Sequence, residues 1–348
     1  MPEPLSILYI GSLNIQSNSY RRFLALKSIS NGITAIDTDP FILAKFIAGF
    51  QHHYNWGPGI YLLNKAVRKA VKNTGCEIVL VDNKTYLTAR TLQYIKQYQS
   101  SAKIANLLTD DPFGLYGKSW SLLKKTASLY DIIFVQRKVN IEEFKLIGAK
   151  KIEICCRSFD PSFNRPLQLS AADVQKYAAE VGFAGTYETF RASFIAYLIQ
   201  NNIAVAVTGD GWPEKDYWDI IKPYYKGPSV YGEEYIKTIN GMGVALHFLR
   251  HANRDEQDSR TFEIPACKVF MLAEHSDLQQ QLFKTNEEVV FFKTKEELLK
   301  KVNYYMVNEA ERIRIALNGY NRCFMSGYDH QSRMKYVLET ISNMSHEA

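Results

Sequence analysis

The sequence predicts an α/β protein made of two Rossmann-like domains with parallel sheets. Two series of short, wholly apolar segments alternate with amphipathic helical segments, which is the pattern of parallel strands covered on both faces. A segment with two prolines and several small polar residues, 157–170, separates the two series. The 348 residues also exceed the roughly 250–300 at which a single core stops growing. We therefore expect an N-terminal domain over 1–160, a second domain over 161–330, and a C-terminal helix over 331–348.

The first series contains six expected strands, all of them short. They comprise residues 5–10, 33–37, 77–82, 103–108, 131–136 and 151–156. Helical patterns occur between these strands at 20–30, 60–72, 88–97 and 141–146. Because the strands have no polar face, helices must cover both sides of the sheet.

The second series repeats this alternation. Its expected strands are one that ends at Gly185, then 203–209, 243–249, 268–274 and 288–292. Its helical patterns cover 191–200, 231–240, 262–267 with Pro265 near its start, 295–321 and 331–344. A second parallel sheet follows from the same argument.

Charge and cysteine content narrow the classes of function. The net charge of +6 comes from 42 basic and 36 acidic residues without a long run of one sign, so nucleic acid is not an expected partner. A mild positive excess suits polyanionic small molecules and, at most, peripheral contact with anionic lipid. Five cysteines without metal-ligand spacing, and no signal peptide or membrane span of about 18 apolar residues, indicate a cytoplasmic protein.

The segment 255–274, DEQDSRTFEIPACKVFMLAE, carries the chemistry needed to bind a nucleoside diphosphate. Asp255 and Glu263 lie eight residues apart, and Arg254 and Arg260 are in the same stretch. A carboxylate can accept hydrogen bonds from both ribose hydroxyls, while guanidinium groups and a helix N-terminus bind pyrophosphate. The alternative is a surface ion-pair cluster beside a buried helix.

Three linked motifs resemble a known family: RTFEIPACKVFMLAE, LFKTNEEVVFFKTKEELLKKVNYYM and RIRIALNGYNRC. They are similar to the C-terminal half of the CgeB-like (spore maturation protein type) glycosyltransferases, over roughly residues 180–335. This resemblance implies the GT-B fold, with two Rossmann-like domains whose parallel sheets face a central cleft. It also implies that the second domain holds a nucleotide sugar, that the first holds the acceptor, and that the last helix crosses back to the first domain.

The resemblance assigns donor-binding roles. Glu263 falls at the second glutamate of the family's E-x7-E pattern, which binds the donor ribose, and Asp255 stands where the first glutamate would be. Lys268 replaces a glycine that is common in the relatives. The expected donor-binding residues are Glu263, Arg260, Arg254, Gly185, Arg191, Val230, Tyr231 and Thr261. Tyr235 fits a buried helix stripe better.

Candidates for the acceptor side follow the strands of the first domain. Gly11 and Ser12 end the first strand and could contact phosphate or acceptor through their backbone, or form an ordinary strand-to-helix loop. Asp111 ends another strand; as a general base, its pKa would be raised by the like charge of Asp110, although Asp-Pro is also a common turn. His52 and His53 are further candidates for the base.

We therefore expect a metal-independent glycosyltransferase of hexosyltransferase type. A UDP-sugar is the leading donor candidate, no other cofactor is expected, and the acceptor could be a glycan, a lipid-linked molecule or a protein. His247 and His251, four residues apart across a strand end, do not form a metal site. The alternatives are a nucleotide-sugar epimerase, which needs no acceptor, and a non-catalytic nucleotide-sugar sensor.

Overall fold

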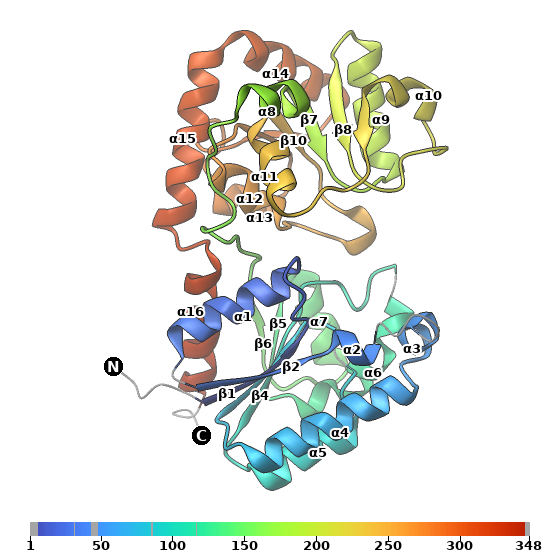
Figure 1. Ribbon diagram of the computed structural model, residues 1–348, viewed down its shortest axis with the longest axis vertical. Helices are drawn as coiled ribbons and strands as arrows, with labels where there is room; N and C mark the ends of the chain where they lie inside the picture. The colour runs from blue at the N-terminus through green and yellow to red at the C-terminus, as the bar shows by residue number, and fades with distance from the viewer. Residues whose placement is uncertain (1–5, 31, 43–47, 85, 116, 345–348) are drawn as a thin grey trace. The chain divides into compact units, whose positions relative to one another are not determined.

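The computed structural model describes residues 6–30, 32–42, 48–84, 86–115 and 117–344, except for the side chain of His52. By its internal contacts the chain divides into two α/β units (Figure 1). Unit 1 comprises Met1–Arg157, His251–Asp255 and His330–Ala348, and unit 2 comprises Ser158–Arg250 and Glu256–Asp329. The first boundary thus lies three residues before the expected one, and the C-terminal helix belongs to unit 1.

Unit 1 contains a six-stranded parallel sheet in the order β2-β1-β3-β4-β5-β6. Its strands are β1 (Ser6–Gly11), β2 (Gly32–Asp37), β3 (Ile78–Asp82), β4 (Lys103–Leu107), β5 (Ile132–Val135) and β6 (Ile152–Ile154). All six correspond to segments that the sequence predicts. Each strand ends at the same edge of the sheet, so the loops that follow them collect there.

Helices cover both faces of this sheet, as the apolar strands require (Figure 1). Leu8 and Ile10 of β1 join the core on one face, and Ile7 and Tyr9 join the core on the other. The helices and turns are α1 (Asn18–Ile29), α2 (Asp39–Ile42), α3 (Ala48–Tyr54), α4 (Pro58–Asn73), α5 (Ala89–Tyr98), η1 (Gly117–Trp120), α6 (Ser121–Thr126), η2 (Ala127–Leu129), α7 (Lys138–Leu146) and α16 (His330–Asn343). Helices α1 and α16 pack against each other on one face, and α4 and α5 pack on the opposite face.

Unit 2 contains a second six-stranded parallel sheet, in the order β12-β11-β10-β7-β8-β9. Its strands are β7 (Ala179–Ala184), β8 (Val205–Thr208), β9 (Tyr225–Gly227), β10 (Met242–His247), β11 (Met271–Glu274) and β12 (Val290–Phe292). The edge strand β9 has only three residues and is not predicted by the sequence, because its YKG carries no apolar run. The two sheets confirm the predicted α/β fold class.

Unit 2 contains the helices that the sequence predicts, two of them altered, together with four short helices or turns that it does not predict. They are α8 (Ala171–Tyr177), α9 (Thr189–Gln200), α10 (Trp218–Ile221), η3 (Lys222–Tyr224), α11 (Gly232–Asn240), α12 (Arg260–Ala266), α13 (Asp277–Leu282), α14 (Lys295–Val307) and α15 (Glu309–Met325). The predicted helix over 295–321 breaks at Asn308, which ends α14 and begins α15. Pro265 lies in the last turn of α12, not near its start, because the helix begins already at Arg260.

The segment His251–Asp255, with the short turn η4 (His251–Asn253), belongs to unit 1 although both of its flanks belong to unit 2. Nothing in the sequence predicts that this segment belongs to unit 1. None of the helices in the described ranges combines the length and the apolar character needed to cross a bilayer.

Candidate functional site

Helix α12 begins beside the carboxyl end of β10, where a buried acidic residue fixes it. Asp258 Oδ1 lies 2.9 Å from Nε2 of His247, the last residue of β10, and accepts the backbone N–H groups of Arg260 and Thr261. Burial opposes the charge on Asp258, but His247, Arg260 and Arg191 hold the pKa of that carboxyl well below its usual value. The carboxylate therefore caps the helix and sets the position of Arg260.

One turn further, Glu263 forms a mixed cluster with Arg260 and Tyr235. The Tyr235 hydroxyl donates to Glu263 Oε2 at 2.6 Å, and the Arg260 guanidinium lies 5.9 Å from the centre of the Tyr235 ring. Glu263 is only 8% exposed. Burial and the neighbouring Glu263 carboxylate raise the pKa of the Tyr235 hydroxyl well above its usual value, so the hydroxyl stays a donor.

This cluster has the groups that a nucleoside diphosphate needs. A buried carboxylate can accept hydrogen bonds from two hydroxyls, and a guanidinium can donate two parallel hydrogen bonds to phosphate oxygens. The sequence treats Tyr235 as part of a buried stripe; the structure instead gives its hydroxyl a direct contact with Glu263. The i, i+4 spacing of Tyr231, Tyr235 and Ile239 predicts only that they share one face of a helix. It does not predict which group the Tyr235 hydroxyl contacts.

The glycine-rich loops after β7 and β8 pack against each other. The Trp212 indole N–H donates to Gly185 O at 2.9 Å, and the indole is almost fully buried. Gly209 has φ of +153°, and a Cβ at this position would lie 1.9 Å from Gly185 O. Packing between the loops therefore explains Gly209, whereas a Cβ at Gly185 would lie 2.7 Å from the Phe183 ring. Trp212 is a core residue of unit 2.

Arg191 lies in α9 and is buried beneath these loops. Its guanidinium donates to Thr186 O at 3.0 Å and to Phe248 O at 3.4 Å, and it pairs with Glu188 at 3.6 Å. Burial lowers the pKa of Arg191. Its contacts tie the loops after β7 and β10 together, and in this arrangement its charge lies close to Asp258.

The remaining donor candidates have different surroundings. Thr261 is fully buried, and its hydroxyl accepts from Asp258 N and contacts Gln279, so the structure gives it a role in starting α12. Val230 lines a small cavity of about 120 Å³, whereas the Tyr231 ring is mostly exposed at the start of α11. Lys268 has φ of +57°, a left-handed conformation, which explains why glycine suits this position after the end of α12.

Arg254, which is expected to bind the donor, and Asp255 lie in the segment that belongs to unit 1. Arg254 forms a two-point pair with Asp111, from Nε to Oδ2 at 2.5 Å and from Nη2 to Oδ1 at 2.9 Å, and also pairs with Glu143 at 2.8 Å. Asp255 pairs with Arg137, and both side chains are almost fully buried. Two carboxylates therefore already engage the Arg254 guanidinium that the sequence assigns to a diphosphate.

The expected raised pKa of Asp111 is wrong. Burial alone would raise it, but hydrogen bonds from Arg254, the Phe113 backbone and Asn140 hold the pKa of Asp111 below its usual value. Asp111 as a whole residue is 3% exposed. Donors therefore surround Asp111 and stabilise its charged form, which makes it a poor proton acceptor.

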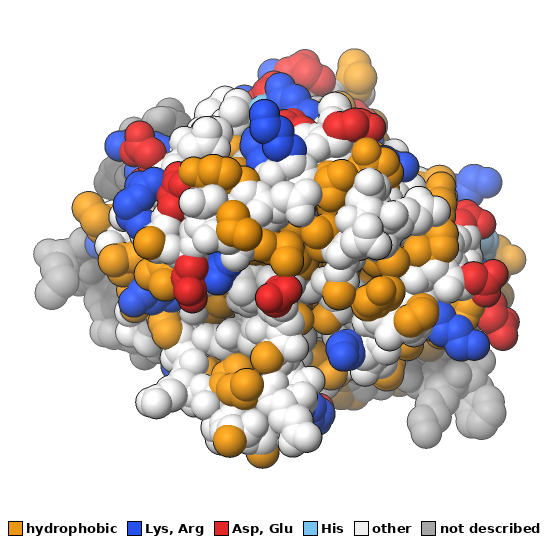
Figure 2. Space-filling view, turned by 90° about the horizontal axis from the view of Figure 1, so that it is seen from above, with side chains coloured by type: hydrophobic (Ala, Val, Ile, Leu, Met, Phe, Trp, Pro, Cys, Tyr) orange, Lys and Arg blue, Asp and Glu red, His pale blue; other side chains and the backbone are white. Residues whose placement is uncertain are grey.

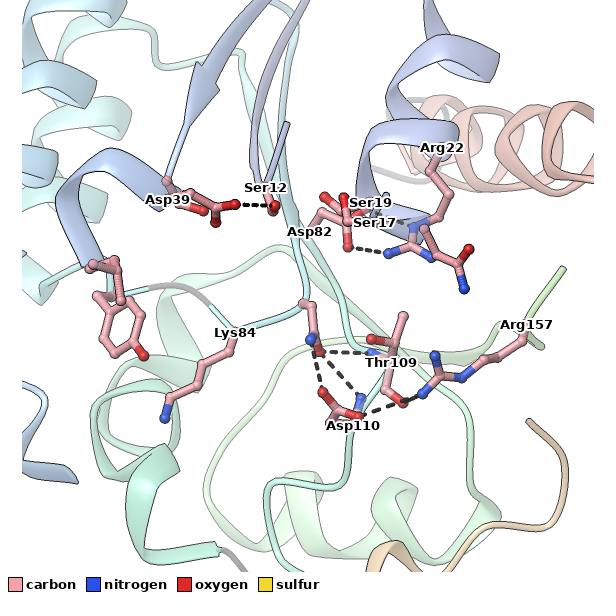
Figure 3. Close-up of a pocket in the computed structure, with 15 residues that line it drawn as sticks. Ser12, Ser17, Ser19, Arg22, Asp39, Asp82, Lys84, Thr109, Asp110 and Arg157 are labelled. Atoms are coloured by element: carbon pink, nitrogen blue, oxygen red, sulfur yellow. Dashed lines mark hydrogen bonds and ion pairs between the residues drawn. The ribbon is translucent and has the colours of Figure 1, made fainter. Parts of the chain in front are cut away.

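A pocket of about 350 Å³ lies at the carboxyl edge of the unit 1 sheet (Figure 3). Residues one to three positions beyond the ends of five strands line it: Ser12 after β1, Asp39 after β2, Lys84 after β3, Asp110 after β4 and Arg157 after β6. The start of α1 contributes three further polar residues, Ser17, Asn18 and Ser19. The pocket thus combines hydroxyl, carboxylate and cationic groups.

Hydrogen bonds hold these groups in place (Figure 3). Ser12 Oγ donates to Asp39 Oδ2 at 2.6 Å, and Asn83 Nδ2 donates to Asp110 Oδ2 at 2.9 Å. Lys84 Nζ lies 5.3 Å from the centre of the Trp120 ring. Burial, partly opposed by Asp110, lowers the pKa of Lys84 to about 8.

The structure therefore separates the two neighbouring aspartates. Asp110 lines the pocket and Asp111 does not. Ser12 also lines the pocket, whereas Gly11 is required by packing, because a Cβ there would lie 2.8 Å from Ser19 Oγ. His53 is exposed on α3 against the Tyr54 ring, and the side chain of His52 lies outside the described residues.

Sequence reasoning missed Asp39, Lys84 and Arg157. Their signal was available, since each follows a predicted strand at its carboxyl end, where parallel sheets bind ligands. Within the described ranges, no three His, Cys, Asp or Glu side chains gather in a group that could hold a metal ion.

Comparison with known proteins confirms the fold and matches part of the chain to a family model. Residues 191–339, which include most of unit 2, match the family model described as glycosyl transferase-like. No match was found among curated proteins. Solved structures align over almost the whole chain. HepE of Anabaena in complex with UDP and glucose has a TM-score of 0.61 at 12% identity, and the match covers 97% of this chain and 100% of that chain.

Two further structures have a TM-score of 0.67 at 11% identity. Sucrose-phosphate synthase of Thermosynechococcus elongatus aligns over 99% of this chain and 100% of its own, and a glycosyltransferase of Rickettsia africae aligns over 100% of both chains. At these identities the likeness defines the fold alone, so the protein has the GT-B fold.

Proposed function

We propose that the protein transfers a sugar from a nucleoside diphosphate sugar to an acceptor and that it needs no metal ion. The observation that carries this proposal is the cluster of Glu263, Arg260 and Tyr235 within the segment that matches a glycosyl transferase-like family. We take UDP as the first nucleotide to test, because HepE, which has the same fold, is described in complex with UDP. The CgeB-like subfamily and a hexose as the transferred sugar belong to the same proposal.

Each residue has a role in this proposal. Glu263 accepts hydrogen bonds from the ribose hydroxyls, with its geometry fixed by the Tyr235 hydroxyl. Arg260 donates to the diphosphate and stabilises the negative charge that develops when the bond between the anomeric carbon and the phosphate oxygen breaks. A cation of this kind can take the part that a metal ion plays in other transferases, which is the reason for proposing metal independence.

The acceptor binds in the pocket of unit 1. Its carboxylates and hydroxyls, Asp39, Asp110 and Ser12 among them, can hydrogen-bond a hydroxyl-bearing acceptor. Asp110 replaces Asp111 as the candidate proton acceptor, because Asp110 lines the pocket and Asp111 does not. The proton leaves the acceptor hydroxyl as its oxygen bonds to the anomeric carbon, and the nucleoside diphosphate departs.

The first test is a thermal-shift screen of nucleoside diphosphates and their sugars against the full chain. A ligand at 100 times its Kd adds about 2.7 kcal/mol of stability, which is easily measured. The proposal fails if no nucleoside diphosphate raises the melting temperature. Turnover of a stabilising nucleotide sugar is then measured with and without acceptor candidates, in EDTA and in Mg²⁺.

The outcomes of these measurements distinguish a transferase from an epimerase and from a sensor. Conversion of the donor to a second nucleotide sugar without acceptor identifies an epimerase. Binding of the nucleotide sugar with neither transfer nor slow hydrolysis identifies a sensor. Activity that EDTA abolishes and Mg²⁺ restores would remove metal independence from the proposal.

A further inference from the structure

Five large apolar residues of unit 1 are exposed within a stretch of 13 residues. This aromatic patch consists of Phe50, Tyr54, Trp56, Tyr61 and Leu62, which are each between 49% and 70% exposed. The Phe50 ring contacts Tyr54 and Trp56, with centroids 4.7 Å and 6.2 Å apart. Exposed apolar surface that gathers in one place marks a site of interaction with a protein or a membrane.

The sequence segments that carry the patch contain basic but no acidic residues. Residues 41–76, which contain the patch, and residues 112–130 hold eight Lys and Arg and no Asp or Glu. The other 293 residues hold 34 basic and 36 acidic residues, so these two segments supply the whole positive excess of the chain. The face in Figure 2 differs, because basic and acidic side chains alternate there among hydrophobic ones.

The two segments are adjacent in the fold. Helix α3 packs against η1, and Asn55 Nδ2 donates to Ser121 Oγ at 3.1 Å. Lys118 and Lys125 are exposed on one segment, and Lys65, Lys69 and Lys72 are exposed on α4 of the other. The patch therefore has lysines in both of the segments that form this side of unit 1.

We propose that this face of unit 1 binds the surface of a bilayer that contains anionic lipids. Trp and Tyr side chains favour the interface between headgroups and acyl chains, since one part of the ring is apolar and another can hydrogen-bond. Lysines beside them are attracted by the negative surface potential of anionic lipid. A protein partner would fit the apolar rings, but the complete lack of acidic residues in 55 residues favours a uniformly negative surface. This inference is independent of the proposed transferase activity.

The test is flotation of the full-length protein with vesicles of phosphatidylcholine alone or of phosphatidylcholine with phosphatidylglycerol. We expect binding to the anionic vesicles only, and weaker binding as salt is raised, because exposed charges are screened over roughly 10 Å at 0.1 M salt. The variant Lys65→Gln/Lys69→Gln/Lys72→Gln should bind more weakly by roughly fivefold for each lysine lost. Its matched control is Lys215→Gln/Lys293→Gln/Lys300→Gln, which changes net charge equally at exposed positions of unit 2.

A second pair of variants tests the rings. Trp56→Ser/Tyr61→Ser should lose binding, whereas Val307→Ser/Met325→Ser, at exposed apolar positions of unit 2, should keep it. Melting temperatures equal to that of the parent show that the variants are folded. The proposal is overturned if the parent does not float with anionic vesicles, or if the control and patch variants lose binding equally. It is also overturned if ultracentrifugation shows a dimer that the patch variant dissociates, since a second copy would then cover the patch.

Discussion

Arg254 and Asp111 are 143 residues apart in the chain and form a two-point ion pair inside unit 1. The Asp111 carboxylate is fully buried, and the Arg254 side chain is about one-third exposed. Because Glu143 binds the same guanidinium, one arginine connects the loop after β4 with helix α7. The pair fixes the segment His251–Asp255 to unit 1 just before the helix that carries Glu263.

Asp111→Asn should destabilise the protein without removing catalysis. The amide cannot accept both hydrogen bonds of the fork, and loss of hydrogen bonds between charged groups in a buried site costs about 1–3 kcal/mol. Urea unfolding measures this cost. Because the pKa of Asp111 is lowered in the folded state, its contribution is present above about pH 4, the unfolded value, and disappears as the pH falls further. The difference between parent and variant should therefore narrow in acid. Unchanged stability with lost turnover would instead restore Asp111 as the base.

Asp110→Asn should lower turnover without lowering the stability of the protein. We expect turnover to fall by about 10²–10⁴-fold, as for loss of a general base, while the affinity for the nucleotide and the free energy of unfolding stay near those of the parent. Steady-state kinetics with the identified donor measures the change. Near-normal transfer by this variant would mean that another group, His52 or His53 included, accepts the proton, or that the departing phosphate does.

Glu263→Ala should weaken the binding of nucleoside diphosphates by about 1.5–3 kcal/mol, since no neutral side chain replaces a buried carboxylate that binds two hydroxyls. Isothermal titration calorimetry measures the loss. Tyr235→Phe, which removes only the hydroxyl that holds Glu263, should show a smaller loss. The parent protein should bind deoxyribose analogues less tightly than the ribose forms. Glu263→Ala should bind the two forms with similar affinity. Equal affinity of parent and variant for the diphosphate would exclude Glu263 from the site.

Arg260→Lys should separate diphosphate from nucleoside recognition. Lysine keeps the charge but lacks the planar fork, so affinity for the diphosphate should fall while affinity for the bare nucleoside stays constant. Calorimetry with the two ligands tests this. A matched Arg254→Lys variant should change neither affinity, because Asp111 and Glu143 hold that guanidinium in unit 1. Parallel losses for both ligands in Arg260→Lys would indicate a folding defect.

His330 should make stability depend on pH near neutrality. It begins α16 and is buried, and burial together with the positive charges of Arg22 and Arg21 lowers its pKa well below the usual value. The unfolded chain therefore takes up a proton below about pH 6.5 that the folded chain does not bind, and stability falls as the pH is lowered. The loss reaches at most about 2 kcal/mol at pH 5.

Urea unfolding at several pH values, with His330→Gln as the comparison, measures this dependence. The variant should lose less stability between pH 7 and pH 5 than the parent. A ring signal of His330 that titrates near pH 6.5 in the folded protein by NMR would contradict the prediction.

The fold class follows from local sequence. Apolar runs such as 77–82 and 131–136 can form strands only where both faces are buried, and this requirement alone leads to parallel sheets between helices. The sequence also indicates the segment around Arg260 and Glu263, because acidic and basic groups suited to the proposed chemistry lie close together in the chain there. Edge strand β9 escaped prediction because three residues with one aromatic carry no periodic signal.

The sequence by itself determined the two α/β units and the segment that carries Glu263, since both depend on residues close together in the chain. The tertiary structure decided which charged side chains line a pocket. Asp110 and Asp111 are identical side chains at neighbouring positions, yet one lines a pocket and the other is buried against Arg254. Arg254 and Arg260 likewise lie six residues apart but belong to different units. Sequence specifies a charge, but its partner comes from distant segments, and only folding brings those segments within hydrogen-bonding distance.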